Sequence, residues 1–305
     1  MPKPKDISIN EKEFILSLLQ NDQKRVDDRG FEEFRNVDIQ FGSSLGNVEV
    51  SLGDTRLIVQ VSAEAVKPYE DRPYEGMFLI TTDISSMASP LFENNRQSNE
   101  EAMVTRLIEK AIRRSHALDL EALVIEAGKL CWMIRADVHY LNYDGGLVDA
   151  TCIGVITALL HFKMPDMTFG NDGKLIIHPI DERPPVPLSI LHVPICVTFS
   201  FFKYQQDAET DNAVKRDICI VDATGKEEAL RHSELTITIN TNRDICQISK
   251  PGGVMTEAVA VMRCANRAFE IATDLTALIH RRLKEDDSIR NKGNLKVILS
   301  AENRR

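Results

Sequence analysis

The sequence predicts an α+β protein built from two similar halves. In each half a series of short strands precedes a helix, first over about 37–161 and again over about 192–284. The stretch 181–187 separates the halves, because three prolines within four residues disfavour the hydrogen bonding of both helix and sheet. We therefore predict domains at 31–187 and 188–285, a helix and arm at 1–30, and a polar tail at 286–305.

The predicted strands of the first half alternate between apolar and polar residues, as in a sheet with one buried face. They are expected at 37–41, 47–52, 55–61, 78–84, 122–127 and 130–140. Gly53-Asp54 separates two of them and is typical of a hairpin turn. The run 148–161 is rich in small apolar residues and predicts a helix packed closely on the sheet.

Similar patterns define the remaining elements. Strands are expected at 192–202, 217–222, 234–240 and 244–248, and a long helix from about 255 to 284. Polar segments at 67–76 and 207–215 are expected to be loops, and 171–173 a hairpin turn. A first helix is predicted to begin with a capping box at Asn10 and to place Phe14, Ile15, Leu18 and Leu19 on one side. The polar residues after Glu285 are expected to be largely disordered.

One predicted helix carries a row of positive charge. At about 100° per residue, the segment from Arg106 to Ser115 gathers its apolar residues on one side. The opposite side carries the basic stripe, defined as Arg106, Lys110, Arg113 and Arg114, of which the first three follow i, i+4, i+7 spacing. The stripe predicts either a solvated helix face or an anion-binding surface, and the helix alone favours the solvated face.

The composition limits the kinds of partner. The formal net charge is −9, whereas nucleic-acid-binding domains are usually basic, so we expect contact with nucleic acid only through a local patch, with partners supplying more charge. No apolar run approaches the ~18 residues of a membrane span, and the amino terminus lacks the apolar segment of a secretory signal. The six cysteines are widely spaced and lie mostly in apolar runs, which indicates buried, reduced thiols in an intracellular protein.

Most sequence signatures of catalysis are missing. There is no G-x-S-x-G, no Walker loop and no G-x-G-x-x-G, and the seven histidines lack metal-ligand spacing, so we expect no metal and no cofactor. Gly252-Gly253 could bind phosphate ahead of a helix, although a conformational role is favoured. Asp222, Glu227 and Glu228 are expected to form a solvated acidic turn, and Asp144-Gly-Gly a plain turn.

Several motifs occur in the order and spacing of a known family. They are 31–35 after the Arg25/Arg29 turn, Met87-Ala-Ser-Pro-Leu-Phe-Glu with Arg96-Gln-Ser, the basic stripe with Leu118-Asp119, Trp132-x-Ile-Arg-Ala-Asp-Val-His, Tyr143-Asp-Gly-Gly-x-x-Asp-Ala, Pro187-Leu-Ser-Ile-x-His-x-Pro-Ile-Cys-Val, Phe199-Ser-Phe-Phe, Val221-Asp222 and Glu227-Glu228. Over about residues 10–285 the chain resembles the RNase PH family, and within it the ring subunits of the eukaryotic RNA exosome.

The resemblance implies a fold, an assembly and a site. The fold is two S5-like β-α units packed as one body. Six such subunits would form a ring under S1/KH cap subunits and above a processive exoribonuclease subunit, and single-stranded RNA would thread its channel during rRNA processing and RNA degradation in nucleus, nucleolus and cytoplasm. By motif position Arg106, Lys110, Arg113 and Arg114 would face RNA, and Arg96 is a weaker candidate.

The resemblance also bears on catalysis. Active relatives attack the 3′-terminal linkage with inorganic phosphate, held in a cradle of hydroxyl and backbone N–H groups and assisted by an acid on a second-domain strand. Here the cradle position reads 249–255, Ser-Lys-Pro-Gly-Gly-Val-Met, and Glu234 lies near the acid position. Both depart from the active pattern, so we predict a non-catalytic structural subunit that helps line the RNA channel. The alternatives are an active phosphate-dependent 3′–5′ exoribonuclease, and a small-molecule kinase on an S5-like fold, for which the required phosphate loop is missing.

Overall fold

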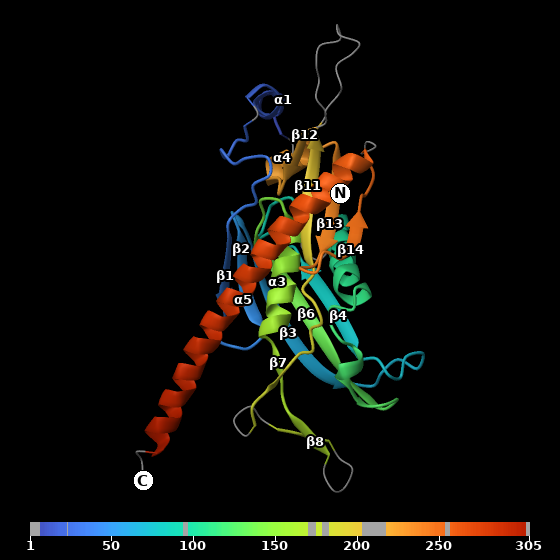
Figure 1. Cartoon of the computed structure of the whole chain (residues 1–305), viewed down its shortest axis with the longest axis vertical. Coiled ribbons are helices and arrows are strands. Elements are labelled where there is room, and N and C mark those ends of the chain that lie inside the picture. Colours follow the sequence, from blue (N-terminus) through green and yellow to red (C-terminus); the bar gives the residue numbers. More distant parts are fainter. Residues whose placement is uncertain are drawn as a thin grey trace.

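The computed structural model describes residues 7–22, 24–93, 97–169, 175–178, 183–202, 218–253 and 257–302, with the side chains of 21–22, 169, 175–177 and 291–302 excepted. Two sheets and the helices between and around them form the molecule (Figure 1). A single cluster of buried apolar side chains joins the two sheets, since it includes Leu57 of the first sheet and Ile237 of the second. The α+β architecture with two strand-then-helix halves is therefore confirmed.

The first sheet has the strand order β1-β2-β3-β6-β4, with β5 paired to β6. Its strands are β1 (Val37–Phe41), β2 (Asn47–Leu52), β3 (Thr55–Val66), β4 (Met77–Asp83), β5 (Val124–Glu126) and β6 (Leu130–Asn142). β4 runs parallel to β6, and the other pairs are antiparallel. Val48, Val50 and Leu52 are fully buried while the residues between them are half-buried, as the alternating pattern predicts.

Two helical segments cover this sheet. α3 (Leu147–His161) lies against β2 and β3 and is buried almost throughout, which explains its small apolar residues. α2 (Asn99–Glu109) lies along β4, continues as a π-helical turn, η2 (Lys110–Arg114), and is followed by the 3₁₀ turn η3 (Glu121–Leu123). The predicted helices at 106–115 and 148–161 are both present, and α2 packs on β4, an edge strand of the sheet.

The second sheet has the order β12-β11-β13-β14, antiparallel throughout. Its strands are β11 (Ile195–Phe202), β12 (Ile218–Val221), β13 (Ser233–Ile239) and β14 (Ile245–Ser249). Every residue of β11 is buried, because α3, α5 and the amino-terminal helix all pack against this strand. β11 therefore carries apolar residues on both of its faces, interrupted by Thr198 and Ser200, instead of a strict alternation.

The amino-terminal helix α1 (Ile9–Ser17) continues as η1 (Leu18–Asp22) and packs on the second sheet. Its capping box joins Ser8 and Glu11, so the prediction of a box at Asn10 is wrong by two residues. Ile15 and Leu19 are buried against Phe202, whereas Phe14 is 56% exposed and does not share the buried side as predicted. The arm thus belongs, in packing terms, to the second sheet.

Several short elements were not predicted. They are α4 (Gly225–Leu230), β7 (Lys163–Met164) and β10 (Val186–Pro187). β8 (Met167–Phe169) and β9 (Leu175–Ile177) pair antiparallel on either side of the predicted hairpin turn. β10 pairs with β7 over two residues, so the end of the proline stretch takes part in sheet pairing, which the three prolines were expected to disfavour. The predicted turn at 171–173 and the loop at 207–215 lie outside the described residues, and the domain boundaries stay predictions.

α5 (Ala258–Glu302) is the longest element. The predictions of a helix end near Lys284 and of a disordered tail are wrong, because the helical backbone continues without a break to Glu302. The first part of α5 packs on β11 and β13. Further along, Arg282 lies 3.0 Å from Asp38, and Arg290 donates to the carbonyl oxygens of Gly42 and Ser43. α5 therefore attaches to both halves (Figure 1).

Candidate nucleic-acid interface

The position of the basic stripe is fixed at the start of its helix. Ser98 caps α2, and its side chain accepts a hydrogen bond from the backbone N–H of Glu101. The Glu101 carboxylate is buried and accepts from the backbone N–H groups of Ser98 at 2.7 Å and of Ile84 at 2.8 Å. Thr105 and Thr82 share a hydrogen bond one turn later. The helix therefore begins against the end of β4, and its orientation follows from that strand.

The apolar side of the helix is buried as predicted. Its buried residues are Val104, Leu107, Ile108, Ala111 and Ile112. The helix ends in a Schellman motif, in which Ala117 N–H bonds to Ile112 O and His116 N–H bonds to Arg113 O. His116 adopts the left-handed conformation that this motif requires, with φ of 56°. Both ends of the basic helix are thus held by local hydrogen bonds.

The π turn η2 changes which cations form the exposed row. A π turn closes with i→i+5 bonds, so four residues fall short of one full rotation, whereas four α-helical residues exceed it. Arg114 therefore returns toward the line of Arg106 and Lys110, and all three are exposed. Arg113 is half-buried and lies 3.2 Å from Glu109, so it is less available to a ligand than the other three. Arg96 lies outside the described residues.

A groove of about 730 Å³ runs along the basic stripe. One wall is η2 and the end of α2, with all four stripe residues, and the other wall comes from the loop 72–75, the segment 118–121 and Leu191. The segment 67–76, which was predicted to be a surface loop, thus brings Arg72 next to the stripe. Nothing in the local pattern of that loop indicated this approach, because it depends on the packing of η3 beneath it.

The charge in the groove is only partly neutralised. Arg72 pairs with Glu75 at 3.0 Å, and Arg113 pairs with Glu109. The Asp119 carboxylate accepts the backbone N–H groups of Glu121 and Ala122. Within the described part of the chain, Arg106, Lys110 and Arg114 have no ion-pair partner, so they leave three solvent-facing cations available for an anionic ligand.

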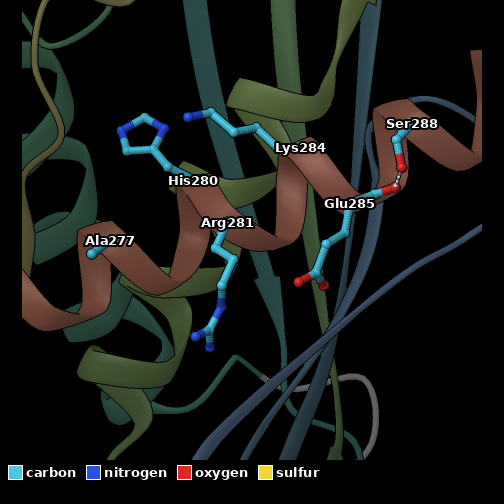
Figure 2. A pocket seen from close by; sticks show the side chains of 6 residues that line it. All are labelled: Ala277, His280, Arg281, Lys284, Glu285 and Ser288. Carbon is cyan, nitrogen blue, oxygen red and sulfur yellow. Dashed lines mark hydrogen bonds between the residues drawn. The ribbon is translucent and has the colours of Figure 1, made fainter.

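A second basic surface lies on the outer side of α5 (Figure 2). A shallow hollow of about 540 Å³ is lined there by side chains of α5 itself, among them His280, Arg281 and Lys284. These basic side chains project from a single exposed helix face, with Glu285 beside them (Figure 2). This surface lacks a second wall, so it matches an ordinary solvated helix face, and the groove at the stripe is the better candidate.

Packing explains the residues at the position where active relatives hold phosphate. Gly253 has φ of 82°, and a Cβ atom there would lie 2.4 Å from Ser233 Cβ and 2.6 Å from His232 O. α5 begins only at Ala258, so the glycine pair does not open the helix. Glu234 is held at 2.5 Å by Arg231, which occupies the carboxylate. These contacts explain Gly253 and Glu234 through packing and ion pairing.

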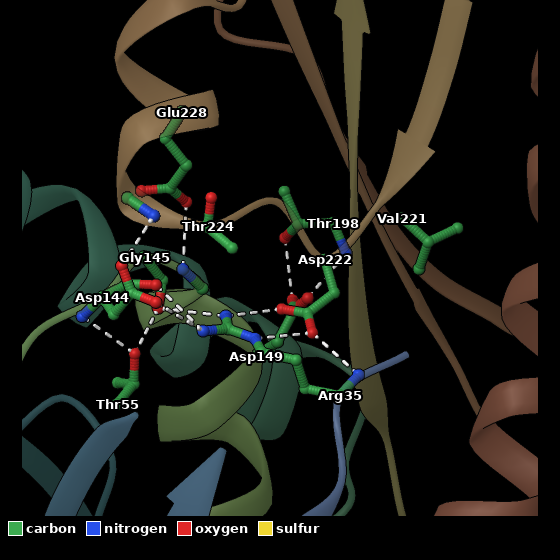
Figure 3. A network of polar contacts seen from close by, with 12 residues as sticks. Arg35, Thr55, Asp144, Gly145, Asp149, Thr198, Val221, Asp222, Thr224 and Glu228 are labelled. Atoms are coloured by element: carbon green, nitrogen blue, oxygen red, sulfur yellow. Dashed lines mark hydrogen bonds and ion pairs between the residues drawn. The ribbon is translucent and has the colours of Figure 1, made fainter. Parts of the chain in front are cut away.

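The acidic group at 222–228 forms a buried polar junction between the halves (Figure 3). We define this polar junction as Arg25, Arg29 and Arg35 with Asp222 and Glu227. Arg35 binds Asp222 through two side-chain nitrogens at 2.8 and 2.7 Å, and Arg25 binds Glu227 at 2.7 Å. Asp222 and Glu227 are each 1% exposed, so the prediction of a solvated turn is wrong for them. Local sequence patterns did not indicate this pairing, because Arg35 and Asp222 are 187 positions apart.

The turn at 144–146 joins the same junction. Gly145 has φ of 76°, and a Cβ atom there would lie 2.7 Å from Gly225 N and 2.8 Å from Ala223 O. Glu228 accepts hydrogen bonds from Gly146 N–H and from the Tyr143 hydroxyl, and burial raises the pKa of Glu228. The Asp144-Gly-Gly motif therefore allows close approach of the two halves.

Asp149 is fully buried beneath the polar junction. Its carboxyl group accepts from the backbone N–H of Thr198 at 2.9 Å and lies 2.7 Å from the Thr198 hydroxyl. Burial raises the pKa of Asp149 well above its ordinary value, and the nearby Asp222 carboxylate adds to the rise. The hydrogen bonds that Thr198 donates to Asp149 oppose this rise but do not cancel it.

We predict that the free energy of unfolding of the Asp149→Asn variant increases relative to that of the wild type as the pH rises. A raised folded-state pKa contributes stability below the ordinary value of ~4, and this contribution is lost as the pH rises through the folded pKa. Between the ordinary pKa and the folded-state pKa, the difference in unfolding free energy between variant and wild type should grow by ~1.4 kcal/mol per pH unit. Urea unfolding of both proteins from pH 4.5 to 8 measures it, and a constant difference would contradict a protonated Asp149.

The comparisons with known proteins agree with a body of two β-α domains. The 3′ exoribonuclease family matches twice, as domain 1 over residues 33–165 and as domain 2 over residues 192–271. The chain therefore belongs to the 3′ exoribonuclease, or RNase PH, family. Within the described residues no group of three His, Cys, Asp or Glu side chains could hold a metal ion, and no helix is long and apolar enough to cross a membrane.

Individual relatives are similar over the full length. The chain is 47% identical to exosome complex component RRP45 of Saccharomyces cerevisiae, covering 100% of this chain and 99% of that protein. It is 46% identical to the Schizosaccharomyces pombe protein of the same name, covering 100% of both chains. Among solved structures, one titled as an Archaeoglobus fulgidus exosome with RNA bound to the active site matches with a TM-score of 0.73 and 27% identity over 88% of this chain and 97% of that chain. The RNase PH-like fold inferred from the motifs is confirmed.

Proposed function

We propose that this protein is an RNase PH-like ring subunit of an RNA exosome that lines the path of single-stranded RNA without cleaving it. The observation that carries the proposal is the groove along Arg106, Lys110 and Arg114, three cations without an ion-pair partner among the described residues, in a chain of net charge −9. The full-length similarity to proteins named exosome complex component RRP45 supports the assembly.

The groove suits a phosphate backbone. Arginine and lysine neutralise phosphates without reading base sequence, so such a site binds RNA of any sequence and weakens with added salt. One wall of the groove is the capped basic helix, whose first part, α2, packs on β4, an edge strand of the first sheet. A neighbouring subunit bound at this side would continue the RNA path. The partners proposed are the other RNase PH-like ring subunits, S1/KH cap subunits and a processive exoribonuclease subunit.

The absence of catalysis is part of the proposal. Phosphorolysis needs donors arranged around an attacking phosphate and a free acid near the leaving oxygen. At these positions Gly253 packs against Ser233, and Arg231 holds Glu234 in an ion pair. The protein would act in RNA processing and degradation in the nucleus, nucleolus and cytoplasm by guiding RNA to another subunit.

Purification of the chain with its partners, followed by mass measurement and an activity assay, tests both parts. We expect a complex containing several related chains. We expect the isolated chain, supplied with inorganic phosphate and single-stranded RNA, to release no nucleoside diphosphates. A closed homo-oligomer that releases them would overturn the proposal in favour of an active phosphate-dependent 3′–5′ exoribonuclease.

A further inference from the structure

A close pair of cysteines joins α5 to the second sheet. Cys219 lies on β12, an edge strand, and Cys264 lies in the second turn of α5. Their Sγ atoms are 3.8 Å apart, within contact distance and with the thiols oriented for a hydrogen bond. Neither residue belongs to the polar junction or to the groove, so the proposed function does not use this pair.

The two thiols have different environments. A hydrogen bond from Cys219, the adjacent Arg263 guanidinium and a backbone N–H lower the pKa of the Cys264 thiol, although burial opposes this. The same hydrogen bond and burial raise the pKa of Cys219. Cys264 therefore has more thiolate character, and the thiolate is the form that attacks oxidants.

The other cysteines lack this combination. Cys152 and Cys196 are completely buried in the core. Burial raises the pKa of Cys131, and burial together with Asp244 raises the pKa of Cys246 to about 11. Cys219 is partly exposed at the sheet edge, which gives a small oxidant a route to the pair.

We propose that Cys219 and Cys264 form a redox modification site, in which a hydroperoxide converts the thiol pair into a disulfide. The Cys264 sulfur attacks one peroxide oxygen, the O–O bond breaks, and the departing oxygen leaves as water or an alcohol. The product is a sulfenic acid on Cys264. The Cys219 sulfur then displaces the hydroxyl group, which leaves as water with the Cys219 proton, and an S–S bond forms. Two electrons pass from the thiols to the peroxide.

The disulfide would link an edge strand covalently to the helix that attaches to both halves. Bond formation requires the sulfurs to approach from 3.8 Å to ~2.05 Å, which side-chain rotation together with a small movement of the early turns of α5 can supply. The cross-link would close a chain segment of more than forty residues, which restricts the unfolded state. The oxidised protein should therefore unfold at a higher temperature, and a dithiol reductant should reverse the shift.

Peptide mapping under non-reducing conditions tests the proposal. The native full chain is treated with one equivalent of hydrogen peroxide, the remaining thiols are capped with N-ethylmaleimide, and the digest is analysed by mass spectrometry. We expect one linked peptide pair joining Cys219 and Cys264, lighter by two hydrogen atoms than the reduced pair. Capping of both cysteines after the treatment, or a disulfide between other cysteines, would overturn the proposal.

Two variants distinguish the roles of the pair. Cys219→Ser should leave a sulfenic acid on Cys264 that dimedone traps, whereas Cys264→Ser should abolish both the disulfide and the dimedone adduct. Cys246→Ser is the control with a partly exposed thiol elsewhere in the second sheet, and it should retain the linked peptide. Dimedone trapped on Cys219 in the Cys264→Ser protein would contradict the assignment of Cys264 as the nucleophile. The wild-type result stands by itself if a variant fails to fold.

Discussion

Asp222→Ala should lower the free energy of unfolding by about 3–5 kcal/mol, a large part of the total stability of a typical domain. Asp222 accepts hydrogen bonds from the backbone and side chain of Arg35 and lies 3.3 Å from Arg29. Removing its carboxylate leaves the buried guanidinium of Arg35 without its main charge partner. Breaking a buried pair in this way costs more than the pair contributes, because the remaining charge stays desolvated. Urea unfolding monitored by fluorescence of Trp132 measures the loss.

Two control variants isolate the cause. Asp222 has φ of 49°, a left-handed conformation that asparagine also tolerates, so Asp222→Asn removes the charge with little backbone strain. It should lie between Asp222→Ala and the wild type in stability. Asp166→Ala removes a carboxylate paired with Arg183 at the surface and should cost ~1 kcal/mol or less. An Asp222→Ala protein as stable as Asp166→Ala would show that the polar junction does not hold the halves together.

The second large effect concerns RNA. Replacing Arg106, Lys110 and Arg114 with alanine should weaken binding of single-stranded RNA by the assembled complex on the order of 10- to 100-fold near physiological salt. Each phosphate contact on a single strand contributes ~0.7 to the slope of log K against log salt, so the slope should fall by ~2. The three side chains are exposed and lack ion-pair partners among the described residues, so stability should change little. Fluorescence anisotropy across a salt series gives both quantities.

α5 offers a control of matched composition. Arg263, Arg281 and Lys284 are also two arginines and one lysine, and all are exposed on α5 (Arg281 and Lys284 are drawn in Figure 2). Their replacement with alanine removes the same net charge and should leave the salt slope nearly unchanged. An equal reduction of the salt slope in both triple variants would indicate a general charge effect and would exclude the groove as the RNA path.

Local pattern predicted the parts of the fold that depend on neighbouring residues. The strands at 37–41 and 47–52 have the predicted bounds, because both alternate apolar and polar residues and the Gly53-Asp54 turn ends the second strand. The buried face of the basic helix was also predicted, since Leu107, Ile108 and Ile112 follow helical spacing. These elements required no knowledge of the tertiary structure.

The features that the sequence did not reveal depend on distant partners. Glu227 occurs in a polar segment that resembles an exposed turn, yet it caps α4 and pairs with Arg25, which is 202 positions away. Residue spacing also did not show that Arg114 lies in the exposed row with Arg106 and Lys110, because this depends on the π turn η2. The second wall of the groove likewise required the packed structure, because Arg72 lies on a loop between two strands.

The continuity of α5 has a consequence for how RNA would be bound. A helix of 45 residues is roughly 65 Å long, and this one is attached to β11 and β13 at one end and to Asp38, Gly42 and Ser43 further along. Rotation of one half against the other would break these contacts, so α5 restricts the relative motion of the two halves. The groove draws residues from both sides of the proline stretch, and its width is therefore set before any ligand arrives. Binding to a preorganised groove loses little conformational entropy, so affinity would depend mainly on charge.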